Sequence, residues 1–164
     1  MNVKVDSVTQ LFEEVNRVLG GGVLERPSVY EAHITVITPP EFDFVLKQSN
    51  VTINEINLAA SRRNIQGFKF GVACIGRGRA INLEEGRKKV LDTYYIVVSD
   101  EDSSFYELRK EIHELYIRKG GDRSRFDPKA FWPHITLGFT ERDLHIQDGV
   151  FKGINSCIKS LRVF

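Results

Sequence analysis

The feature that most constrains this chain is a tripeptide, His-Ile-Thr, which occurs twice, at positions 33–35 and 134–136. Each copy lies in a short run of β-branched or large apolar residues, 32–37 and 133–139, and such runs are typical of strands. Side chains at positions i and i+2 of a strand point to the same face, so each His should share a face with its Thr. If there were only one copy, the ordinary explanation would be a core histidine whose hydrogen bonds are satisfied. Two copies in matching surroundings indicate a functional site instead.

The residues before each copy repeat as well. Apolar residues spaced for one face predict a helix over Ser7–Leu19, with Ser7 and Gln10 as a capping box and three glycines at its end. The same spacing predicts a helix over Ser104–Lys119, which two glycines end. The chain therefore contains a unit of helix, glycine, loop and strand twice. We expect an internal duplication with the site at its axis.

This arrangement resembles the 2H phosphoesterase superfamily, whose name comes from two His-x-Thr/Ser motifs in two pseudo-symmetric lobes. The residues that carry the resemblance are His33, Thr35, His134 and Thr136. It covers nearly the whole chain and implies a single domain over 1–164 of the α+β class. Two pseudo-symmetric lobes, each an antiparallel sheet with outer helices, would surround a central cleft. The sequence looks closer to the RNA-repair branch, which includes LigT-like proteins and the cyclic phosphodiesterase domain of fungal tRNA ligases. The Arg that this branch carries shortly after its second motif has no counterpart, because the nearest candidate here is Arg142.

Two imidazoles and two hydroxyls suit the hydrolysis of a 2′,3′-cyclic phosphate. One imidazole would take a proton from water, and the other would protonate the departing ribose oxygen. Thr35 and Thr136 would donate hydrogen bonds to phosphate oxygens on which charge develops. The resemblance implies a 2′-phosphate product, with His134 as the base and His33 as the acid. We therefore expect a metal-independent phosphodiesterase without a cofactor that acts on RNA 2′,3′-cyclic phosphate ends or nucleoside 2′,3′-cyclic phosphates, in RNA repair or processing.

Other activities share the same four residues and stay open. The first alternative is a hydrolase of 2′-5′-linked oligonucleotides or cyclic nucleotide signals, or a 3′-5′ RNA exonuclease. The second is a nucleotide-binding module that has lost turnover. The sequence identifies neither the physiological substrate nor a kinase or ligase domain that would accompany this one.

Aromatic and basic residues near the motifs are candidates for substrate binding. Tyr30 precedes the first motif and Trp132 the second, and an exposed ring can stack on a base. Arg123 and Arg125 lie in the loop before the second motif and could bind phosphate. The alternatives are aromatic rings that fill the core and a solvated loop.

Composition limits the remaining choices. The net charge of +1 argues against a protein that coats nucleic acid, although an RNA 3′ end or a small nucleotide remains a suitable partner. Cys74 and Cys157 form no metal-site spacing, and we expect no metal. Their simplest interpretation is two reduced, buried thiols, with one disulfide as the alternative. No apolar run is long enough to span a membrane, so we expect an intracellular protein, cytoplasmic or nuclear. We also expect a monomer.

The rest of the chain reads as alternating helices and strands. Residues 38–41 should open a short helix that turns Phe42, Val45 and Leu46 inward. The remaining predicted elements are strands over Val51–Leu58, Gly67–Ile75 and Thr93–Val98, a tight turn at Gly76–Arg79 and an edge strand within Ser156–Phe164.

Overall fold

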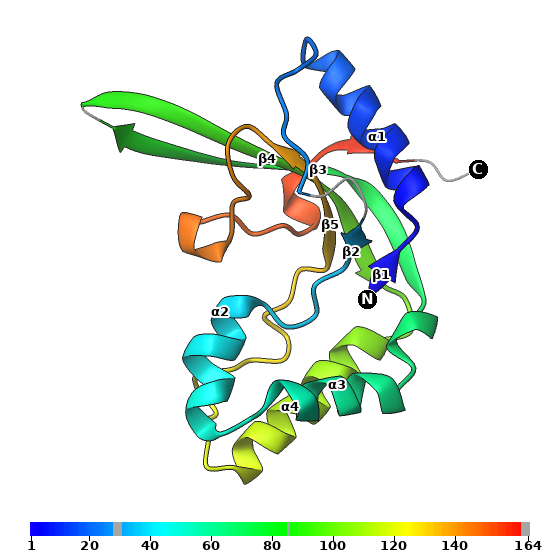
Figure 1. Cartoon of the computed structure of the whole chain (residues 1–164), viewed down its shortest axis with the longest axis vertical. Coiled ribbons are helices and arrows are strands. Elements are labelled where there is room, and N and C mark those ends of the chain that lie inside the picture. The colour runs from blue at the N-terminus through cyan, green and yellow to red at the C-terminus, as the bar shows by residue number, and fades with distance from the viewer. Residues whose placement is uncertain (28–30, 85, 162–164) are drawn as a thin grey trace. The chain divides into compact units, whose positions relative to one another are not determined.

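The protein has an α+β fold, seen in a computed structural model that describes residues 1–27, 31–84 and 86–161 (Figure 1). The chain forms two compact units. One, here called the helical unit, comprises Met1, Thr35–Gly71 and Asp100–Phe131. The other, the sheet unit, comprises Asn2–Ile34, Val72–Ser99 and Trp132–Phe164.

The sheet unit is built around a four-stranded sheet with the order β5-β4-β3-β6. Its strands are β3 (Phe70–Glu84), β4 (Arg87–Asp100), β5 (His134–Phe139) and β6 (Cys157–Ser160). β5 is antiparallel to β4, and β6 is antiparallel to β3. In β4 every side chain from Thr93 to Val98 is buried, as expected for the most β-prone stretch of the chain. The prediction of a strand over Thr93–Val98 is confirmed.

A second, two-stranded sheet pairs β1 (Asn2–Val3) with β2 (Ala32–His33), and helix α1 (Val5–Val18) follows β1. Both α1 and β2 contact β5. The helix predicted over Ser7–Leu19 is confirmed, but its start is not. Lys4 stands at the N-cap without a side-chain hydrogen bond, so the capping box predicted at Ser7 is wrong. Two short 3₁₀ turns, η4 (Ile146–Asp148) and η5 (Ile154–Ser156), complete this unit.

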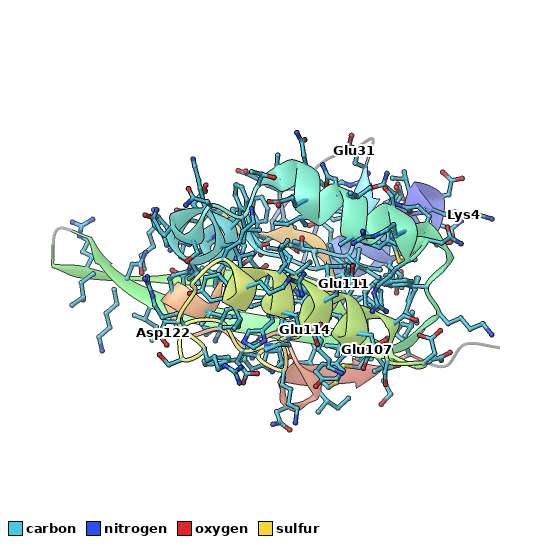
Figure 2. The ribbon with its side chains drawn as sticks, turned by 90° about the horizontal axis from the view of Figure 1, so that it is seen from below. Lys4, Glu31, Glu107, Glu111, Glu114 and Asp122 are labelled. Carbon is cyan, nitrogen blue, oxygen red and sulfur yellow. A yellow bond between two sulfur atoms is a disulfide. The ribbon has the colours of Figure 1, made fainter. Side chains whose placement is uncertain are left out.

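The first helix of the helical unit is α2 (Pro39–Glu41), which continues into the π-helix η1 (Phe42–Leu46) and the 3₁₀ turn η2 (Lys47–Ser49). Its other elements are α3 (Ile53–Arg62), η3 (Ile65–Gly67) and α4 (Ser104–Arg118). The helix predicted over Ser104–Lys119 is therefore confirmed. Glu111 lies on the side of α4 that faces α3, where it pairs with Arg62 at 2.8 Å (Figure 2). Leu46 is fully buried, as the inward face predicted for residues 42–46 requires.

Two predicted elements are wrong. Val51–Leu58 was expected to be a strand, yet α3 occupies most of it, because Thr52 and Glu55 form a reciprocal capping box that begins a helix. The tight turn expected at Gly76–Arg79 lies inside β3. A Cβ atom on Gly76 would collide with the ring of Tyr95, so this glycine serves close packing within a strand rather than a turn.

The two cysteines are joined, which makes the expectation of reduced thiols wrong. Cys74 of β3 and Cys157 of β6 form a disulfide with their Cα atoms 5.7 Å apart. The bond connects the two strands at the β6 edge of the sheet, and β6 confirms the edge strand expected within Ser156–Phe164 over its described part. No helix among the described residues is long and apolar enough to cross a membrane.

The antiparallel sheets and outer helices of the expected fold are present, but the two compact units differ from each other. Among the described residues, both sheets belong mainly to one unit, and α2, α3 and α4 belong to the other. His33 and His134 lie together in the sheet unit. A pseudo-symmetric pair of lobes stays a prediction.

Candidate functional site

The second His-x-Thr motif lies on β5, where the sequence places it. His134 is opposite Val97 of β4, and Thr136 is opposite Tyr95. Ile135 and Leu137 are buried, whereas His134 and Thr136 are half-buried. The prediction that this His and this Thr share one strand face is confirmed, and the strand holds both side chains on a rigid element.

The first motif is only partly in a strand. β2 ends at His33, which lies opposite Asn2 of β1, and its side chain is exposed. The strand expected over 32–37 is therefore too long, because β1 supplies only two partner residues and the prolines that open α2 follow soon after. Burial still alternates from Ala32 to Val36, with Thr35 half-buried. β2 contacts β5 within the sheet unit (Figure 1), whereas Thr35 begins the helical unit.

His134 has a defined tautomer. Its Nδ1 lies 2.8 Å from the main-chain oxygen of Trp132, and a carbonyl oxygen can only accept a hydrogen bond. Nδ1 must therefore carry the proton, which leaves the lone pair on Nε2. Burial, the largest cause, and the nearby Lys152 cation together lower the pKa of His134 from 6.5 to about 4. At neutral pH the imidazole is thus neutral, with the basic lone pair on Nε2.

The same face carries a largely buried polar cluster that the sequence analysis did not identify. Asp143 follows β5, and both its oxygens lie 2.8 Å from Nζ of Lys152. The carboxylate also accepts hydrogen bonds from the hydroxyls of Thr93, at 2.6 Å, and Thr136, at 3.1 Å. Lys152 is only 3 % exposed. The cluster ties a catalytic candidate, Thr136, to residues from three separate segments.

Tyr95 connects the cluster to the histidine. Its ring lies edge-on to the ring of His134, with the centroids 5.8 Å apart, and Nζ of Lys152 lies 5.4 Å from the Tyr95 centroid. The Tyr95 hydroxyl is buried, and burial raises the pKa of this hydroxyl, whereas the neighbouring Ser156 side chain lowers it. No short motif marks these contacts. Only the strand pairing between β4 and β5 could have indicated that Tyr95 accompanies Thr136.

The predicted substrate-binding residues fall in different places. Tyr30 lies outside the described residues. Trp132 is half-buried in the sheet unit, and its ring meets that of Phe151, which is 52 % exposed, at a centroid distance of 5.0 Å. Arg123 and Arg125 belong to the helical unit, where Arg125 donates to the main-chain oxygen of Phe44 at 3.0 Å. Phe151 is thus a further aromatic candidate, beside Trp132, which the sequence analysis missed.

The comparisons with known proteins give one match. A family model described as "Swiss Army Knife, 2H phosphoesterase domain" matches residues 1–145. No curated protein and no solved structure matches the chain. The matched range includes both His-x-Thr motifs and Asp143, whereas Phe151 and Lys152 lie beyond it.

Proposed function

Because the chain belongs to the Swiss Army Knife group of 2H phosphoesterase domains, we propose that it is a metal-independent phosphodiesterase acting on 2′,3′-cyclic phosphates of RNA ends or nucleosides. Family membership supports a phosphoesterase in general. The choice of a cyclic phosphate, of a 2′-phosphate product and of a role in RNA repair goes further. That choice rests on the two histidines and on the aromatic residues beside the second one.

The observation that carries the proposal is the state of His134. A general base must be unprotonated at the working pH and must present its lone pair to the proton that it takes. The lowered pKa of His134 meets the first requirement, and the hydrogen bond from Nδ1 to Trp132 meets the second. Both features support the assignment of His134 as the base that activates water.

His33 is the proposed general acid. It is exposed at the end of β2, beside β5, so solvent can supply it with a proton and a substrate can reach it. Protonation of the leaving ribose oxygen by His33 would complete the reaction that His134 begins. Thr35 and Thr136 would donate hydrogen bonds to the non-bridging oxygens, on which negative charge develops. Each proton transfer contributes roughly 10²- to 10⁴-fold to the rate in enzymes of this kind.

Trp132 and Phe151 are the proposed contacts to the nucleobase. A half-buried indole packs edge-to-face against an exposed phenyl ring, so an exposed ring face is at hand on which a base can stack, and stacking of this kind accepts any base. Trp132 also holds His134 through its carbonyl oxygen. A base on this surface would bring the adjoining ribose phosphate close to the histidine.

The proposal is tested by incubating the protein with the four nucleoside 2′,3′-cyclic monophosphates in excess EDTA and resolving the 2′- and 3′-phosphate products. We expect 2′-phosphates, undiminished turnover in EDTA and loss of turnover in His33→Ala and His134→Ala. His113→Ala is the matched control, because His113 lies on α4 in the helical unit. Among the described residues no group of three or more His, Cys, Asp and Glu is arranged to hold a metal ion, yet metal independence itself is decided by the EDTA arm.

The same panel distinguishes the alternatives when it includes 2′-5′-linked oligoadenylate, cyclic dinucleotides and a single-stranded RNA with a free 3′ hydroxyl. Turnover of one of these substrates alone would replace the cyclic phosphate assignment. Binding without turnover of any substrate would identify a nucleotide-binding module. Rescue of an EDTA-inhibited enzyme by a divalent ion would replace the two-histidine mechanism with metal-assisted hydrolysis.

A further inference from the structure

The Thr136 hydroxyl already donates a hydrogen bond within the protein, and its proposed role requires it to give up that bond. A hydroxyl has one proton, and the proton of Thr136 points to Oδ2 of Asp143 at 3.1 Å. To donate to a phosphate oxygen, Thr136 must turn that proton away from the carboxylate. Asp143 then keeps the Thr93 hydroxyl, the Leu144 N–H at 3.0 Å and Lys152. The carboxylate stays satisfied in both states, so the turn leaves no buried acceptor unpaired.

Lys152 has a second effect, which acts on His134. The groups that bear on His134 are Lys152, Asp143 and His145 from the segments after β5, and Tyr95 from β4, with His33 on the neighbouring β2. Lys152 disfavours a proton on His134, whereas Asp143 favours one. The two opposite charges lie 2.8 Å apart and act on the histidine in opposite directions, and the effect of Lys152 is the larger of the two. Removal of one charge alone would leave the other uncompensated.

We propose that Asp143 and Lys152 are a positioning pair of the candidate active site: the carboxylate holds the Thr136 hydroxyl on the strand face that carries His134, and the ammonium balances the charge of the carboxylate near that imidazole. Neither residue touches the reacting atoms. The inference rests on the proposed function, since the pair acts on the two groups, Thr136 and His134, to which that function gives a role.

The test uses two neutral replacements of similar shape, Lys152→Met and Asp143→Asn, together with the double variant. The first readout is the titration of His134 by NMR, which needs no substrate. Lys152→Met should raise the pH at which His134 takes up its proton by about one unit or more, because an anion then lies nearby without its cation. The double variant should return this pH to within about half a unit of the wild-type value. Lys159→Met is the control, because Lys159 lies exposed on β6, and it should leave the titration unchanged.

The second readout is kinetic. In Lys152→Met the acid limb of the pH profile of kcat/KM should move to higher pH, in step with the NMR titration. The loss of rate of this variant at low pH should appear in kcat rather than in KM. A merely structural ion pair would destabilise the fold without moving this limb. The double variant guards against a failure to fold, because it leaves no buried charge unpaired.

Two results would overturn the inference. One is a His134 titration in Lys152→Met that matches the wild type, and the other is a double variant that stays as far displaced as the single one. If the wild type hydrolyses no substrate of the panel, the proposed function fails, while the NMR titrations still decide whether the pair controls the charge of His134. The two failures are therefore distinguishable.

Discussion

Replacing Arg109 with methionine should cost about 3 to 5 kcal/mol of the free energy of unfolding. The guanidinium of Arg109 on α4 is fully buried, and its Nη2 lies 2.7 Å from Oε1 of Glu41. The rings of Phe126 and Phe131 cover it at 4.9 and 5.0 Å. Its N–H groups also donate to four main-chain oxygens, those of Val36, Asp127, Pro128 and Ala130. Methionine removes the charge and the donors, so a carboxylate and these carbonyls lose their partner, which is the source of the cost.

Urea denaturation and thermal melting measure this loss. A domain of ordinary stability has about 5 to 15 kcal/mol in total, so the variant should lose a large part of it, and its Tm should fall by roughly 6 to 20 °C. Arg62→Met is the matched control, because Arg62 is 62 % exposed in its pair with Glu111 and should cost less than about 1 kcal/mol. Adding Glu41→Gln to Arg109→Met should recover part of the loss, since the amide is cheaper to leave unpaired than the carboxylate. Equal losses in Arg109→Met and Arg62→Met would refute the reasoning.

Three further predictions follow from the sheet unit. When the pH falls from 7 to about 4.5, the wild type should lose about 2 kcal/mol of its free energy of unfolding, and His134→Asn should not. The reason is that the imidazole takes up its proton near pH 6.5 in the unfolded state and near pH 4 in the folded state. An equal loss of stability with falling pH in the two proteins, measured by denaturation, would contradict this. Cys157→Ser should lower the free energy of unfolding by about 4.5 kcal/mol, according to the loop-entropy model for a separation of 83 residues. A reducing agent should lower the Tm of the wild type but not that of the variant. Thr136→Val should lower kcat by roughly 10²- to 10³-fold, with recovery in Thr136→Ser, and full activity of the valine variant would remove Thr136 from the mechanism.

Local sequence patterns were enough to predict several helices and strands. The helix α4 follows from apolar residues spaced for one face and from the glycines after it, and β4 follows from its run of β-branched and aromatic residues. The His-x-Thr face of β5 follows from the two-residue period of a strand. These features depend on neighbours within a few residues, which a single sequence displays. The capping box of Thr52 and Glu55 is just as local, yet the β-branched residues around it favoured a strand, and this prediction was wrong.

The tertiary structure decided the features that depend on residues distant in the sequence. Gly76 stays in β3 because the Tyr95 ring occupies the space of a side chain, and the pairing of Cys74 with Cys157 depends on the adjacency of β3 and β6. The neutral state of His134 likewise depends on burial and on the Lys152 cation. The sequence by itself determined where the two His-x-Thr motifs lie and so which groups we propose for the chemistry. Their charge states and hydrogen-bond partners were decided by the fold, because electrostatic interactions and hydrogen bonds act over distances in space, whatever the separation along the chain.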